Sequence, residues 1–261
     1  MDVKTAYEQW LHDFAADADT IADLKAIAND PAEIEDRFYT ELSFGTAGMR
    51  GVLGAGMNRM NRYNVRRATK GLAKYLLQNP QEAQRGVVIA YDSRRFSAEF
   101  ARDTALVLAQ EGVPAYLFDA LRPVPILSYA VRHLHAIAGI VITASHNPAQ
   151  YNGFKVYGPD GCQLTPDRAA QIAEKLQSHS YFDGHKTESF ASLLAAGRIR
   201  WIPDAVLDAF VDAVLALRMG SGSLSDLSVV YTPLHGSGLE CVEKLLGRLD
   251  VGRLTLVEAQ K

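Results

Sequence analysis

The chain has 261 residues, of which 48% are hydrophobic and 22% are charged, a composition typical of a globular protein that buries a core. Lys and Arg number 27 against 30 for Asp and Glu, and the net charge of -3 predicts that neither nucleic acid nor anionic lipid is a partner. Two cysteines, a polar amino terminus and no apolar run near the ~20 residues that cross a bilayer predict a cytoplasmic protein, neither secreted nor inserted in a membrane.

The first part of the chain reads as a helical extension. Between residues 5 and 42, apolar side chains recur at three- and four-residue spacing, which predicts short amphipathic helices. Asn64 is a candidate N-cap for a further helix that ends near residues 79–80. We therefore assign residues 1–42 to an amino-terminal extension and residues 43–218 to the main domain.

Apolar strands alternate with helices through the main domain. The predicted order is strand 86–91, helix 97–110, strand 113–118, helix 124–134 and strand 137–143. The strands are continuous apolar runs, as expected when helices cover both faces of a sheet. The fold class is therefore α/β, with a mixed, largely parallel sheet covered by helices on both faces.

The rest of the main domain is less regular. It is predicted to contain a hairpin-like stretch (154–157 and 161–164), a helix opened by Thr165 and Pro166, a looser region (177–196) and a helix from Pro203 to Arg218.

A linker rich in Gly and Ser leads into a second unit, and we assign both to residues 219–261. A buried strand at 227–231, a helix at 236–249 and a strand at 253–257 would make one βαβ unit, the start of a second, similar α/β domain. Such a unit leaves sheet edges and helix faces uncovered. We therefore expect the natural polypeptide to continue beyond Lys261, so that its remainder is a partner of this part.

The most informative loop follows the strand predicted at 137–143. It presents Ser145 at the carboxyl end of a strand, where open α/β sheets bind ligands. A serine hydroxyl is a weak nucleophile without help, and His146 and Lys155 are the nearby candidates for proton transfer or charge stabilisation. The alternative is an ordinary turn in which Asn147 and other polar side chains satisfy the backbone.

A glycine-rich segment at residues 44–51 is a candidate phosphate loop. Its glycines, which include Gly45 and Gly48 on either side of Thr46, allow backbone amides to approach an anion, and Arg50 offers a forked donor suited to phosphate. The spacing matches neither a Walker loop nor the dinucleotide fingerprint. A flexible connection is therefore the alternative.

Two other loops follow predicted strands. Asp92 and Arg94 share the sheet rim with Ser145, where an ion pair that braces the loop is favoured over direct phosphate contact. The loop at 232–238 opens a helix whose amino terminus could receive an anion, although packing at the entry to the second unit explains it equally well.

Basic side chains away from these loops suggest little chemistry. Four arginines gather at the start of the helix after Asn64, where the macrodipole disfavours cations, so an anion lies nearby or the side chains extend into water. We expect at least two to be solvated. They are Arg59, Arg62, Arg66 and Arg67.

The histidines do not suggest a metal site, because five of them share no spacing typical of metal ligands. These are His12, His133, His135, His179 and His185.

Five segments together resemble the α-D-phosphohexomutase family in order and spacing across almost the whole chain. They are residues 44–51, 91–94, 143–148, 152–157 and 233–238. The helical extension and the run at 56–62 resemble the phosphoglucomutase and phosphopentomutase branch more than the phosphoglucosamine mutase branch. This resemblance favours the functional interpretation of the serine loop and the glycine-rich loop over their structural alternatives.

The resemblance implies that Ser145 carries a phosphoryl group, donates it to a sugar monophosphate and takes back the other phosphate of the resulting bisphosphate. Lys155 and His146 would then manage protons, and Arg50 would steady the phosphoryl charge. The implied supporting residues are Gly45, Thr46, Gly48, Asp92, Arg94, Asn147 and Asn152. Mg²⁺ would bind the Ser145 phosphate and an aspartate-rich loop that this chain lacks, and glucose 1,6-bisphosphate would be the intermediate and activator.

The implied reaction interconverts glucose 1-phosphate and glucose 6-phosphate, so the substrate partner is a phosphosugar. The alternatives are a mannose or pentose phosphate substrate, or a mutase-like module that binds phosphate without catalysis. Because the metal loop and the carboxy-terminal phosphate-binding domain of the family are missing, we expect this chain alone to be inactive.

Overall fold

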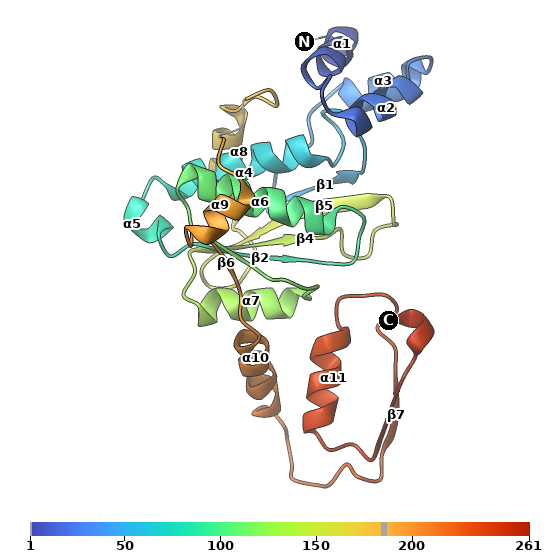
Figure 1. The fold of residues 1–261 in the computed structure, drawn as a ribbon, viewed down its shortest axis with the longest axis vertical. Coiled ribbons are helices and arrows are strands. Elements are labelled where there is room, and N and C mark those ends of the chain that lie inside the picture. Colours follow the sequence, from blue (N-terminus) through green and yellow to red (C-terminus); the bar gives the residue numbers. More distant parts are fainter. Residues whose placement is uncertain (1, 184–186) are drawn as a thin grey trace.

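The computed structural model describes residues 2–183 and 187–261, and most of its elements gather around one sheet (Figure 1). Six strands form this sheet in the order β1-β5-β4-β2-β3-β6. They are β1 (Met49–Val52), β2 (Val87–Tyr91), β3 (Ala115–Leu117), β4 (Ala138–Ile142), β5 (Tyr151–Tyr157) and β6 (Ile199–Trp201). The four strands β4, β2, β3 and β6 run parallel, whereas β5 is antiparallel to β4 and β1. The predicted mixed, largely parallel sheet is confirmed.

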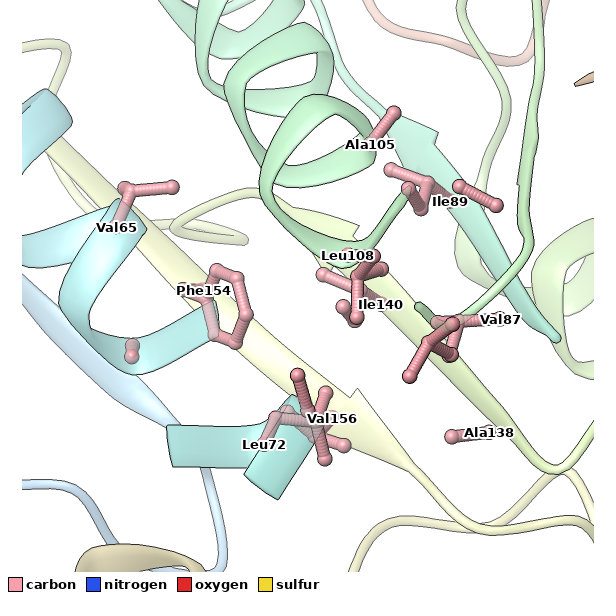
Figure 2. Packing of buried hydrophobic residues seen from close by; sticks show 14 of the residues in the cluster. Val65, Leu72, Val87, Ile89, Ala105, Leu108, Ala138, Ile140, Phe154 and Val156 are labelled. Carbon is pink, nitrogen blue, oxygen red and sulfur yellow. The ribbon is translucent and has the colours of Figure 1, made fainter. Parts of the chain in front are cut away.

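Helices cover both faces of the sheet, as predicted. One face holds α4 (Arg62–Leu76), α6 (Ser97–Glu111), α8 (Pro166–Gln177) and α9 (Phe190–Ala195), and the other holds α7 (Val124–His133) and α10 (Ala205–Leu215). Figure 2 shows the first face, where Val65 and Leu72 of α4 and Leu108 of α6 surround Phe154 and Ile140. Every residue of β4 is buried, which explains why this strand is apolar throughout.

The first three helices are short, as predicted for this part of the chain, and they share an aromatic cluster. They are α1 (Val3–Asp13), α2 (Ala18–Ala26) and α3 (Pro31–Phe38). Trp10 is only 1% exposed, and the centres of the Phe14, Tyr63 and Phe38 rings lie 4.9, 5.6 and 5.8 Å from the centre of its ring. Tyr63 belongs to α4, so this cluster joins the extension to the helices of the sheet.

The second unit contains β7 (Ser228–Tyr231), α11 (Leu239–Arg248), β8 (Arg253–Leu256) and the 3₁₀ turn η1 (Glu258–Gln260). The parallel strands β7 and β8 make the predicted βαβ unit. The expectation that its first strand is buried is wrong, because Val230 is 72% exposed. Within the described residues this sheet has two strands, so its apolar residues find too few neighbours to cover them.

The N-cap of α4 is Asn61 rather than Asn64. The side-chain oxygen of Asn61 accepts hydrogen bonds from the main-chain N–H groups of Tyr63 and Asn64 at 3.1 and 3.0 Å. Asn64 lies inside the helix, buried, and its side chain donates to the main-chain oxygen of Arg59 at 2.7 Å. The preceding loop folds over α4, so an asparagine that looks like a cap is used for tertiary contacts.

The four arginines around this cap are paired with carboxylates, so the expectation that at least two extend into water is wrong. Three of the side chains are 14% exposed or less, and only Arg62 is about half exposed, at 47%. The pairs are Arg59 with Glu33 and Asp36, Arg62 and Arg66 with Asp103, and Arg67 with Glu41. The anions come from α3, α6 and the loop after α3, which the sequence does not place beside α4.

Some short elements differ from those predicted. The looser region at 177–196 contains α9, and β6 after it adds a strand that pairs with β3. The second half of the predicted hairpin is a single bridge between Tyr157 and Gln163. The brief helix α5 (Pro80–Ala83) follows α4, and α10 ends at Leu215, before the predicted Arg218. No helix in the described part of the chain is long and apolar enough to cross a membrane.

Candidate active site

The sheet brings one end of four strands together at a common rim. The strands β2 and β4 are parallel neighbours in which Tyr91 pairs with Ile142, so the loops that follow them leave side by side. The antiparallel strand β5 begins at the same edge, and β1, antiparallel to β5, ends there. The order of the strands therefore gathers Arg50, Lys155, Ser145 and Asp92 although they lie far apart in the sequence.

Ser145 is exposed on this rim, in a backbone conformation unusual for serine. Its φ is 58°, in the left-handed region. Its main-chain N–H donates to Thr143 Oγ1 at 2.9 Å, and its main-chain oxygen accepts from Arg94 Nη2 at 2.8 Å. The Ser145 hydroxyl lies 3.3 Å from His146 Nδ1. The hydroxyl is therefore held at the surface beside an imidazole, where it can react.

The loop after Ser145 wraps around the Arg94 guanidinium. Besides the Ser145 carbonyl, this group donates to the main-chain oxygens of Asn147, Pro148 and Tyr151. Asp92 lies beside it, with a carboxylate oxygen 3.5 Å from Arg94 Nε. These contacts agree with the interpretation that Asp92 and Arg94 brace the loop.

Lys155 and Arg50 place two cations near the serine loop. Lys155 is 9% exposed, and it pairs across the sheet with Val141. Burial lowers the pKa of Lys155, the nearby charge of Arg50 lowers it further, and the Asp92 carboxylate opposes this shift. Arg50 is exposed and donates to Asn147 Oδ1 at 2.7 Å. The rim thus holds a partly desolvated amine and a guanidinium within the same charge cluster.

The glycine-rich segment forms a tight turn against β5. Gly45 and Gly48 exchange main-chain hydrogen bonds of 3.0 and 2.8 Å, so these two amides are used inside the turn, and Thr46 is exposed at its tip. A Cβ at Gly48 would lie 2.0 Å from the Phe154 main-chain oxygen, and its φ is 75°. Only glycine fits this position, which lets the turn lie flat on the strand that carries Lys155.

Asn152 supports the site from inside the protein. It is fully buried, and its side-chain amide donates to Arg95 O and Ser97 Oγ at 2.9 and 3.0 Å. It therefore joins the start of β5 to the start of α6 and does not border the cavity described next.

A cavity of about 700 Å³ opens above the rim, between the main sheet and the second unit. Ser145, His146 and Arg94 line one wall, and the loop at 234–237 lines the opposite one. Ser93 Oγ donates to His235 O at 2.6 Å across this boundary. The loop at 232–238 thus faces the serine, and both interpretations of it, anion binding and packing, stay open.

Thr143 is a site residue that sequence reasoning missed, although it contacts Ser145 directly. Its hydroxyl donates to Asp92 and accepts from the Ser145 N–H group. The sequence pattern places it only at the end of an apolar strand. The signal that could have found it is a hydroxyl side chain two residues before the serine, in a segment where every preceding strand residue is apolar.

Comparisons with known proteins agree with this architecture. The family model described as "Phosphoglucomutase/phosphomannomutase, alpha/beta/alpha domain I" matches residues 41–182, more than half of the chain. The chain belongs to this family. The resemblance to phosphohexomutases is thereby confirmed, as is the α/β class of the fold.

The phosphoglucomutases of two staphylococci are among the relatives of this family member. That of Staphylococcus haemolyticus (strain JCSC1435) is 41% identical over 229 residues, which cover 87% of this chain and 40% of the relative. That of Staphylococcus aureus (strain USA300) is 41% identical over 231 residues, covering 88% and 41%. A Thermus thermophilus structure described as a phosphomannomutase matches with a TM-score of 0.67 and 26% identity, covering 84% of this chain and 46% of that one. The chain thus spans less than half the length of these relatives.

The described residues of this family member do not assemble a magnesium site. No group of three or more His, Cys, Asp or Glu residues among them is arranged to hold a metal ion. Asp92, the carboxylate that shares the rim with Ser145, is already bonded to Thr143, Ser97 and Arg94. His185, one of the histidines considered above, lies outside the described residues. The described residues therefore bring too few ligands together to hold Mg²⁺ on their own.

Proposed function

We propose that this chain is the phosphoserine-bearing part of a phosphosugar mutase that interconverts glucose 1-phosphate and glucose 6-phosphate. The observation that supports this proposal best is the exposed hydroxyl of Ser145, held in a left-handed turn at the rim. His146 lies 3.3 Å from it, Arg50 is bonded to Asn147 of the same loop, and Lys155 interacts electrostatically with Arg50 and Asp92. Phosphoryl transfer depends mainly on such positioning and on charge neutralisation. The 41% identity to phosphoglucomutases favours glucose phosphates as the substrates.

The proposed transfer breaks the P–O bond to Ser145 Oγ and forms a new one to a sugar hydroxyl. That hydroxyl loses a proton, the serine oxygen regains one, and Lys155 and His146 manage these protons. Arg50 steadies the phosphoryl charge, with Asn147 as its hydrogen-bond partner. Gly45, Thr46, Gly48, Asp92, Arg94 and Asn152 support the loops. The bisphosphate so formed, glucose 1,6-bisphosphate, returns its other phosphate to the serine.

The proposal extends to parts of the protein outside this chain. Mg²⁺ would neutralise phosphate charge and would take most of its ligands from the remainder of the polypeptide, which is also the expected partner. We further propose that residues 1–42, 43–218 and 219–261 are the extension, the serine domain and the start of a second domain. A cytoplasmic location and the absence of nucleic-acid and membrane partners stay predictions.

A second candidate is a phosphomannomutase, because the matching Thermus structure carries that description. A phosphopentomutase and a non-catalytic phosphate-binding module stay candidates as well. The relative rates of the full-length enzyme on glucose, mannose and pentose phosphates would distinguish the three activities, and no turnover on any of them would favour the module.

Replacing Ser145 tests the central claim. In the full-length enzyme, Ser145→Ala should remove both mutase turnover and the phosphate that mass spectrometry finds on this serine, because no other oxygen lies at the same place. The control Ser93→Ala removes a hydroxyl from the same cavity and should leave Ser145 phosphorylated. The 261-residue chain alone should show no turnover. Activity that survives in Ser145→Ala would refute the proposal.

A further inference from the structure

The backbone of Ser145 adopts a conformation that costs free energy. A left-handed φ of 58° is unfavourable by about 1–2 kcal/mol for a residue other than glycine. The chain could avoid this cost with a glycine, but a glycine has no hydroxyl to react. The conformation must therefore be held by neighbours, and both polar groups of the Ser145 backbone are in fact bonded to side chains, Thr143 and Arg94.

Thr143 holds the amide side of Ser145. It is 6% exposed, and its own main chain is fixed by a hydrogen bond of 3.0 Å from its N–H group to Gly153 O. Its hydroxyl donates to Asp92 Oδ2 and at the same time accepts from the Ser145 N–H group at 2.9 Å. A valine of similar shape would make neither bond. The hydroxyl of Thr143 is therefore the group that bonds to the Ser145 backbone.

Asp92 fixes the Thr143 hydroxyl in turn. Its other carboxylate oxygen accepts from Ser97 Oγ at 2.8 Å and from the Arg94 main-chain N–H at 3.0 Å. These partners belong to the loop after β2 and to the start of α6, so the carboxylate is held from two sides. With its proton donated to Asp92, Thr143 Oγ1 directs a lone pair at the Ser145 amide.

We propose that Thr143, oriented by Asp92, is the positioning residue that sets the left-handed backbone of Ser145 and so aims the hydroxyl into the cavity. The inference rests on the proposed function, because it concerns the reaction of that hydroxyl. A displacement of a reacting atom by about 1 Å can cost about 100-fold in rate. Thr143, which also borders this cavity, thus contributes to the rate through the backbone of Ser145.

Three variants of the full-length enzyme test this role. Thr143→Val should lower kcat by about 10- to 100-fold and leave KM within about twofold, because the change acts on the placement of the reacting hydroxyl. Thr143→Ser keeps the hydroxyl and should retain kcat within about threefold. The matched control is Thr104→Val in α6, which also removes a buried threonine hydroxyl, there bonded to Phe100 O at 2.8 Å. It should leave kcat and KM unchanged.

A second measurement does not depend on activity. Hydrogen exchange of the Ser145 amide in the unphosphorylated full-length protein, followed by NMR, should be about tenfold or more faster in Thr143→Val than in the wild type and in Thr104→Val. If the wild-type enzyme transfers no phosphate but this difference in exchange is found, the proposed function fails and the positioning of Ser145 by Thr143 stands.

Three results would overturn the inference. The first is an unchanged kcat and an unchanged Ser145 exchange rate in Thr143→Val. The second is a loss in Thr143→Ser as large as in Thr143→Val, which would show that the hydroxyl is not what matters. The third is an equal loss in Thr104→Val, which would mark a general loss of stability.

Discussion

At the scale of single residues, Lys155 differs most from an ordinary surface lysine. It is buried on β5, and both burial and the neighbouring Arg50 lower its pKa. The folded protein therefore binds this proton less tightly than the unfolded chain does. It follows that the charged amine destabilises the fold, and that stability rises as the pH increases through the lowered pKa toward the ordinary value of 10.5.

Replacing this lysine by an uncharged residue should reverse the penalty. We expect Lys155→Met to be more stable than the wild type near neutral pH and to lose the rise in stability on the alkaline side, because the desolvated charge is gone. Urea unfolding of the unphosphorylated chain between neutral pH and pH 10.5 measures both effects. In the full-length enzyme the same change should lower kcat by about 10²–10⁴-fold.

The exposed Lys74 on α4 offers the matched control for this measurement. Lys74→Met removes an amine from the surface and should leave the free energy of unfolding near neutral pH close to that of the wild type. If Lys155→Met were less stable than the wild type at every pH, the amine would be a stabilising charge, and the assigned direction of its pKa shift would be wrong.

At the scale of elements, the amino-terminal helices are joined to the sheet domain by aromatic packing. Trp10 of α1 contacts Tyr63 of α4 and Tyr181 beyond α8, at 5.6 and 5.5 Å between ring centres. Tyr63 also donates to Asp17, at the cap of α2, at 2.6 Å. The extension is therefore packed as part of the same core as α4. Loss of these aromatic contacts should destabilise both the extension and the sheet domain.

Trp10→Ala should lower the free energy of unfolding by about 3–5 kcal/mol, the usual cost of removing a fully buried large aromatic side chain. Denaturant unfolding of the chain, followed by circular dichroism, measures the change. The control is Trp201→Ala, which removes a ring that is 40% exposed and should cost much less. Equal losses in the two variants would contradict the structural importance given to the aromatic cluster.

The elements also show where sequence patterns are sufficient. The helix α6 and the fully buried strand β4 were predicted within about a residue or two, because a complete apolar helix face and a continuous apolar run are clear local patterns. The three-residue strand β6 was missed, because so short a segment has no period to detect. Its pairing with β3 comes from the sheet and not from its own residues.

At the scale of the whole molecule, Arg122 links the main sheet to the second unit. Its side chain is 4% exposed, and its guanidinium donates to Glu240 of α11 at 2.6 Å. Asp119 is farther away, at 3.9 Å, and Glu240 is 42% exposed. Glu240 is the nearest anion to this buried guanidinium, whereas the half-exposed glutamate can turn to water instead.

This asymmetry predicts unequal effects of the two partners. Glu240→Ala should cost about 1–3 kcal/mol, because it leaves a buried cation without its nearest anion, and Arg122→Met should cost less. The double variant should resemble Arg122→Met alone. Urea unfolding of the four proteins gives the double-mutant cycle. Additive effects, or a larger loss in Arg122→Met, would contradict the proposed link.

The sequence by itself determined the alternation of strands and helices, the rim position of Ser145 and the family. These features follow from local spacing and from the order of short motifs. Both can be read from the sequence without knowing which residues contact each other. Only the tertiary structure decided which polar groups meet. It paired Arg59 with α3, used Asn61 rather than Asn64 as the cap, and placed Thr143 between Asp92 and the Ser145 amide. The physical reason is that hydrogen bonds and ion pairs join atoms across strands, and sequence spacing does not encode such distances.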